Sequence, residues 1–181
     1  MESIYWIIYW LVVIICGTGC FFIIKTNVLR YGIIFLISIL LSVSFCIFFY
    51  FNGFYRFVLP IYLILLPVIC SFGFLILFLI KYRPTKYTFP FYFSVLTFIL
   101  GCEIFLKDVV GFIVFRNGWD LWDSYSFYWV YVRIFDFIGE RVISEKWRKP
   151  VPYDKRMYWI IFLVMIVISF VILGYTLNWW L

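Results

Sequence analysis

The residues that could carry chemistry lie in one polar stretch, residues 103–141, of an otherwise apolar chain. The first part of this stretch is rich in carboxylates and also holds one lysine. If these side chains gather at one membrane surface, they form a mouth that could bind a cation, a polar solute or a lipid headgroup. The candidate residues are Glu103, Lys107, Asp108, Asp120 and Asp123.

Asp120 and Asp123 form an Asp-x-x-Asp pair, a spacing also found in metal-binding pairs of lipid and prenyl enzymes. The same spacing suits the start of a helix. There, one Asp can cap backbone N–H groups, and a second lies near the positive end of the helix dipole. Glu103 and Lys107 are spaced as an i, i+4 ion pair with the Glu first. A binding site and ordinary capping with one ion pair therefore remain alternatives for this group.

A second polar group, Arg133 and Asp136 with Glu140 nearby, lies within an apolar and aromatic segment. The i, i+3 spacing allows Arg133 and Asp136 to form an intramembrane ion pair. Ionisable residues inside a membrane are candidates for lining a pathway. The alternative is that Arg133 reaches the headgroups from near the end of a membrane span.

Other chemistry is not supported by the sequence. The chain has no His, which removes the usual general base at neutral pH and the commonest metal ligand. No P-loop, zinc-protease motif or Ser–His–Asp set is present. The five cysteines all fall in apolar segments, where packing is the expected role. We therefore predict no catalytic residue, no metal and no cofactor.

The composition places most of the chain in lipid. Hydrophobic residues make up 67% of the 181 residues and charged residues 13%, and the mean hydropathy is +1.09. Soluble domains are about 45–50% apolar and about 25% charged. The net charge of +6 is then explained by basic cytoplasmic loops, without nucleic-acid binding.

The elements that position the polar stretch are predicted to be membrane-spanning helices, each about 20 residues long. We expect an all-α bundle of six spans in a single transmembrane domain, residues 1–181. The last span closes on Trp179 and Trp180, an aromatic belt at the membrane interface. A patch of small residues at 16–20 predicts a close helix contact. The expected spans are 4–24, 31–51, 57–80, 87–106, 121–138 and 157–180.

Whether segment 121–138 crosses the membrane decides the topology. Eleven of the fifteen Lys and Arg residues lie in the loops 25–30, 81–86 and 141–156. If all three loops are cytoplasmic, 121–138 must cross, and both termini lie outside. The alternative is five spans with 121–138 as an interfacial amphipathic helix. That arrangement puts the most basic loop on the side opposite the other two, against the positive-inside rule.

The sequence around residues 105–141 resembles a family of uncharacterised small multi-pass membrane proteins of spore-forming bacteria. The residues that carry the resemblance are Asn117-Gly118-Trp119 after an apolar segment, followed by an aromatic helix that contains Arg133. It covers the last third of the chain. The resemblance implies multi-pass helices and no assigned activity.

The expected function is an accessory or structural role in the cell envelope, as a multi-pass protein of the cell membrane. The alternatives are a small-solute or ion permease or channel, and a membrane-embedded lipid-modifying enzyme. The expected partners are the lipid bilayer, anionic lipid headgroups at the loop 141–156, and other membrane proteins or further copies of this chain.

Overall fold

The computed structural model describes residues 2–176 and is almost entirely helical. Six α-helices form the bundle, and a π-helical turn, Phe105–Val109, directly extends the fourth. Two short strands, β1 (Tyr55–Phe57) and β2 (Ile113–Phe115), lie between helices. The helices are α1 (Glu2–Ile24), α2 (Val28–Phe51), α3 (Ile61–Tyr82), α4 (Thr88–Ile104), α5 (Leu121–Val142) and α6 (Arg156–Thr176).

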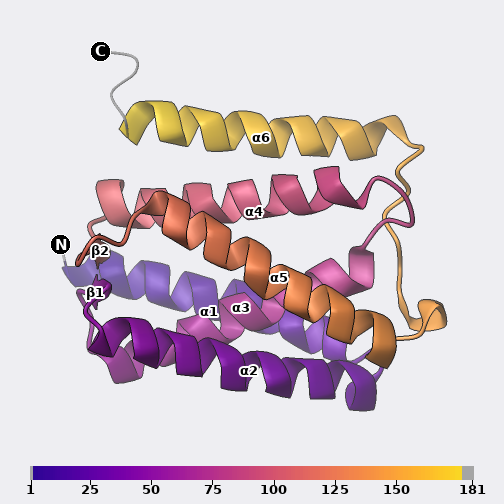
Figure 1. Ribbon diagram of the computed structural model, residues 1–181, viewed down its shortest axis with the longest axis horizontal. Coiled ribbons are helices and arrows are strands. Elements are labelled where there is room, and N and C mark those ends of the chain that lie inside the picture. The colour runs from indigo at the N-terminus through magenta and orange to yellow at the C-terminus, as the bar shows by residue number, and fades with distance from the viewer. Residues whose placement is uncertain (1, 177–181) are drawn as a thin grey trace.

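The helices run back and forth between two ends of the molecule (Figure 1). One end carries β1, β2 and the start of α1, and we call it the strand end. The other end carries the connections 25–27, 83–87 and 143–155, and we call it the basic end. All three basic loops predicted from the sequence therefore lie at one end, and α5 runs between the same two ends as the other helices.

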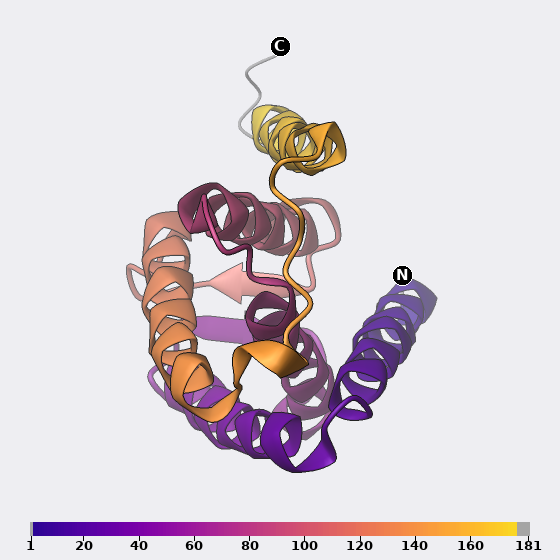
Figure 2. The same cartoon turned by 90° about the vertical axis from the view of Figure 1, so that its right-hand side faces the viewer.

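Viewed from the basic end, α2, α3, α4 and α5 form the centre of the bundle (Figure 2). Helix α1 packs on α3 and α2, and α6 packs on α4, so both lie at the periphery. The largest fully buried side chains include Tyr31, Tyr131 and Phe135. The core combines aliphatic and aromatic side chains, and it lies where α2, α3, α4 and α5 meet.

Five of the helices, all except α5, are long and apolar enough to cross a membrane. The predicted spans match these helices closely, and the largest differences are at the start of α2, which begins at Val28 and not at residue 31, the start of α3 and the end of α5. Helix α3 begins at Ile61, not at residue 57, because residues 55–57 pair with β2. Helix α5 begins at the predicted residue but continues to Val142. Residues 177–180 of the predicted last span, with Trp179 and Trp180, lie outside the described residues.

The sequence did not predict the two-stranded sheet. Tyr55 pairs with Phe115, and Phe57 with Ile113, in antiparallel register. Asn117 closes this end by donating from its amide to the carbonyl of Asn52 at 2.9 Å. The pairing ties the α2–α3 connection to the α4–α5 connection, so it fixes the place where α5 enters the bundle.

Glycines allow close contacts between helices. A Cβ added at Gly19 in α1 would lie 2.3 Å from the ring of Phe74 in α3, which confirms the predicted contact at residues 16–20. A Cβ at Gly139 in α5 would lie 2.8 Å from Ile80 in α3. Small residues at these positions let the helix backbones approach each other closely.

Replacing Gly139 by alanine is expected to destabilise the contact between α5 and α3 by about 1–3 kcal/mol, because the whole Ile80 side chain blocks the new methyl group. Gly32→Ala is the matched control, since Gly32 lies in α2 with no atom within 4 Å of an added Cβ. Thermal unfolding in detergent measures both variants. Equal melting temperatures for G139A and the wild type would contradict the close packing.

Candidate functional site

Two carboxylates are buried in the bundle, one near each end. Glu103 lies in the last turn of α4 at the strand end and is 6% exposed. Asp136 lies in α5 toward the basic end and is 8% exposed. Buried carboxylates are costly unless charges or hydrogen bonds compensate them, so their partners determine what each site can do.

Hydroxyl groups surround the Glu103 carboxylate. Tyr55 in β1 donates to Oε1 and Tyr128 in α5 donates to Oε2, each at 2.8 Å. The Ser124 hydroxyl lies 3.4 Å from Oε1 and 2.7 Å from the Tyr55 hydroxyl. We call Glu103 with Tyr55, Ser124 and Tyr128 the hydroxyl cage. It joins α4, β1 and α5, so three parts of the chain meet at one carboxylate.

Trp119 closes the hydroxyl cage from the α4–α5 connection. Its indole N–H lies 3.1 Å from the Tyr55 hydroxyl and 3.0 Å from Ser124 Oγ. The rings of Phe49 and Phe54 pack against the indole. Burial, reinforced by the Glu103 carboxylate, raises the pKa of Tyr55 well above its ordinary value. Tyr55 is therefore a neutral hydrogen-bond donor.

The other four residues of the predicted carboxylate mouth do not join the cage. Lys107 and Asp108 pair with each other at 2.6 Å. Asp120 caps α5 by accepting from the N–H groups of Trp122 and Asp123, and Asp123 accepts from the N–H of Asp120. In residues 2–176, no three Cys, Asp or Glu side chains are grouped so that they could hold a metal ion. The Asp-x-x-Asp pair is thus a capping box.

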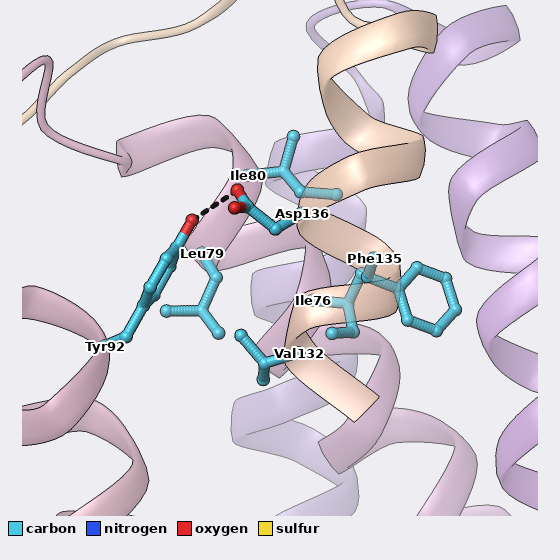
Figure 3. Close-up of a pocket in the computed structure, with 7 residues that line it drawn as sticks. All are labelled: Ile76, Leu79, Ile80, Tyr92, Val132, Phe135 and Asp136. Carbon is cyan, nitrogen blue, oxygen red and sulfur yellow. Dashed lines mark hydrogen bonds between the residues drawn. The ribbon is translucent and has the colours of Figure 1, made fainter. Parts of the chain in front are cut away.

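Asp136 is held by cations. Arg133 lies 2.9 Å from Oδ2, at the i, i+3 spacing expected from the sequence. Arg83, which follows α3, lies 2.8 Å from Oδ1 and also pairs with Glu140. The Tyr92 hydroxyl in α4 donates to Oδ1 (Figure 3). This group connects α3, α4 and α5 in the same way that the hydroxyl cage connects the other end.

Figure 3 also shows the apolar side chains that pack beside Asp136, from α3 and α5. They include Ile76, Leu79 and Val132, and the space between them leaves no room for a ligand. The Asp136 group is therefore a closed contact between helices.

Two arginines fasten the C-terminal end of α5. Arg148 donates to the carbonyls of Gly139 and Ile143, and Arg30 donates to the carbonyl of Val142 and to Ser144 Oγ. The last carbonyls of a helix lack partners within it, and cationic groups interact favourably with this end of the helix dipole. The Gly139 carbonyl also accepts the backbone N–H of Ile143 at 2.9 Å. Part of the positive charge at the basic end is thus used to hold α5 in place.

The sequence did not reveal Tyr55 as a partner of Glu103, or Tyr92 and Arg83 as partners of Asp136. These partners come from parts of the chain that lie far from the carboxylates in sequence. One signal in α5 could have pointed to the inward face. Ser124, Tyr128 and Tyr131 recur at helical spacing, and all three are buried. A hydroxyl-bearing face of this kind indicates polar contacts inside the bundle.

Comparisons with models of protein families, with curated proteins and with solved structures find no match for this chain.

Replacing Asp136 by asparagine removes the negative charge that Arg83 and Arg133 share. Both arginines are partly exposed, so we expect a loss of about 1.5–3 kcal/mol in the free energy of unfolding, the range for hydrogen bonds to charged groups. Glu140→Gln is the matched control. Glu140 pairs with the same Arg83 but is 53% exposed, so its loss is expected to cost about 0–1 kcal/mol. Unfolding in mixed detergent measures the two variants. A D136N protein as stable as E140Q would show that the buried group does not hold the helices.

Proposed function

We propose that this chain is a six-span protein of the cell membrane with an accessory or structural role in the cell envelope. The observation that carries the role is that each acidic residue in the stretch 103–141 is engaged within the protein itself. In the part of the chain that is described, no buried side-chain nitrogen or oxygen lacks a hydrogen-bond partner. Such an arrangement supports a bundle that keeps its shape and acts through its surface.

The direction of its side chains supports α5 as the sixth span. At about 1.5 Å per residue, its 22 residues reach about 33 Å, enough for a hydrocarbon core of about 30 Å. Tyr128 and Tyr131 point inward, whereas Val130, Ile134 and Phe137 are exposed. An interfacial helix directs a polar face to water and an apolar face to lipid, and it does not run through a bundle.

The charge distribution supports an orientation. The three basic loops lie at one end, which the positive-inside rule places in the cytoplasm. The strand end then faces outward with both termini. Arg141, Lys146 and Lys149 lie in or beside the loop that follows α5, where we expect anionic lipid headgroups to bind.

The surface supports a role through neighbours in the membrane. Helix α6 packs on α4 and exposes apolar side chains along its length, including Leu163, Val167 and Phe170. Lipid covers such a surface, as can another membrane protein or a further copy of the chain.

The test compares the wild-type protein with two variants in liposomes and in cells. We expect no solute flux that depends on Arg133, no lipid turnover that depends on Asp120 and Asp123, and membrane partners that co-purify after crosslinking. Two other results would contradict the proposal. If the wild type shows solute flux and R133L abolishes it, the chain is a permease.

If the wild type shows lipid turnover that depends on a divalent ion and the D120N/D123N variant loses it, the chain is a lipid-modifying enzyme. Asp154→Asn, in an exposed part of the basic end, is the control.

A further inference from the structure

The two buried carboxylates differ in their charge partners. Asp136 has two arginines within 2.9 Å, whereas the structure gives Glu103 no ion pair in residues 2–176. The charge of Lys107, one turn further along, attracts Glu103, but its ammonium group pairs with Asp108 at 2.6 Å. Glu103 is thus a buried acid whose direct hydrogen-bond partners are all hydroxyl groups.

A buried carboxylate without a cation is costly, and binding a proton removes that cost. The protonated acid must then donate its new O–H to an acceptor, or a buried donor is left unsatisfied. A site that binds a proton reversibly therefore needs partners that can form hydrogen bonds with both the ionised and the protonated carboxyl group. Backbone N–H groups serve only the ionised form, since they can donate but never accept.

The partners of Glu103 are all hydroxyls, which donate and accept. In the ionised form, Tyr55 and Tyr128 donate to the two carboxylate oxygens. Either oxygen of the 2.7 Å contact between Tyr55 and Ser124 can be the donor. If the Tyr55 proton turns toward Ser124, the Tyr55 oxygen can accept from Glu103. The cage therefore satisfies both forms of the acid with the heavy atoms in the same places.

We propose that Glu103 is a reversible proton-binding site at the strand end of the bundle. A proton from water binds Oε1, and the carboxylate becomes a neutral carboxylic acid. The Glu103 O–H then donates to Tyr55, the Tyr55 O–H donates to Ser124, and Tyr128 continues to donate to Oε2. No bond other than the new O–H forms or breaks, and the protein gains one positive charge.

The other groups that face Glu103 do not compete for this proton. Tyr55 from β1 and Tyr128 from α5 are phenols with an ordinary pKa of about 10, and the Tyr55 value is raised further. Ser124 and Trp119 do not titrate in this range. Lys107 is the one cation that acts on Glu103 from the π-helical turn. The inference goes beyond the proposed accessory role and depends on neither that role nor the orientation.

Infrared difference spectroscopy of the full chain in lipid nanodiscs tests the site, because a protonated carboxyl group has a distinct C=O stretching band. Labelling glutamate with ¹³C identifies a Glu band without any substitution, and the sequence has only Glu2, Glu103, Glu140 and Glu145 to label. We expect a ¹³C-shifted protonated band that appears reversibly on acidification above the range in which exposed glutamates titrate, around their ordinary pKa of about 4.3, and that is absent in E103Q over the same range. Glu140→Gln, which removes an ion-paired acid, is the matched control and keeps the band.

The Tyr55→Phe variant shows whether the Tyr55 hydroxyl takes part in proton binding or has only a structural role. The variant removes a hydrogen bond from both forms of the acid, and the bond to the ionised form is the stronger one because it is charge-assisted. The band is therefore expected to appear at a pH about one unit higher than in the wild type. A wild-type spectrum without a reversible glutamate band above the range in which exposed glutamates titrate, or a band above that range that persists in E103Q, would overturn the proposal. The labelled wild type gives this answer even if E103Q does not fold.

Discussion

Hydrocarbon offers no hydrogen-bond partner, so every polar group of a helix inside a membrane must find its partner within the protein. If α5 crosses the membrane, as we propose, this constraint acts on α5 most strongly. Tyr128 reaches Glu103 in α4, and Tyr131 lies 2.9 Å from the Ser38 hydroxyl in α2. Asp136 reaches Arg83 beside α3. The polar side chains of one helix thus hold three others, and each contact also satisfies a group that lipid could not.

The two ends of α5 are fixed by different chemistry. At the strand end, the capping box and the hydroxyl cage engage carboxylates with neutral donors. At the basic end, Asp136 and the last carbonyls of α5 are engaged by arginines. This difference leaves one buried acid with a cation partner and one without. The same comparison supports proton binding at Glu103 and a structural role for Asp136.

Much of the fold could be predicted from the sequence, because apolar length is a local property. The five apolar helices and the start of α5 at Leu121 follow from hydropathy and from the capping pattern at Asp120. The sheet could not be predicted in this way, since Tyr55 and Phe115 pair across 60 positions of the chain. The close approach of α1 to α3 was indicated by the small residues around Gly19.

The candidate site was predictable only in part, for a related reason. Local spacing correctly places Arg133 beside Asp136 and makes Asp120 and Asp123 a cap. The sequence expectation grouped Glu103 with the carboxylates that follow it in the chain. In the structure its partners are hydroxyls from β1 and α5, which local patterns do not reveal.

We propose that α5 crosses the membrane with its polar side chains turned into the bundle, and a topology map can test this. Single cysteines at Lys25, Lys86, Asn117 and Lys149, in a cysteine-free background, are labelled in intact cells with a membrane-impermeant reagent. If α5 crosses the membrane, only the cysteine at Asn117 is labelled before the cells are opened. Labelling at both Asn117 and Lys149, with Lys25 and Lys86 protected, would contradict it and show that α5 lies on the outer surface.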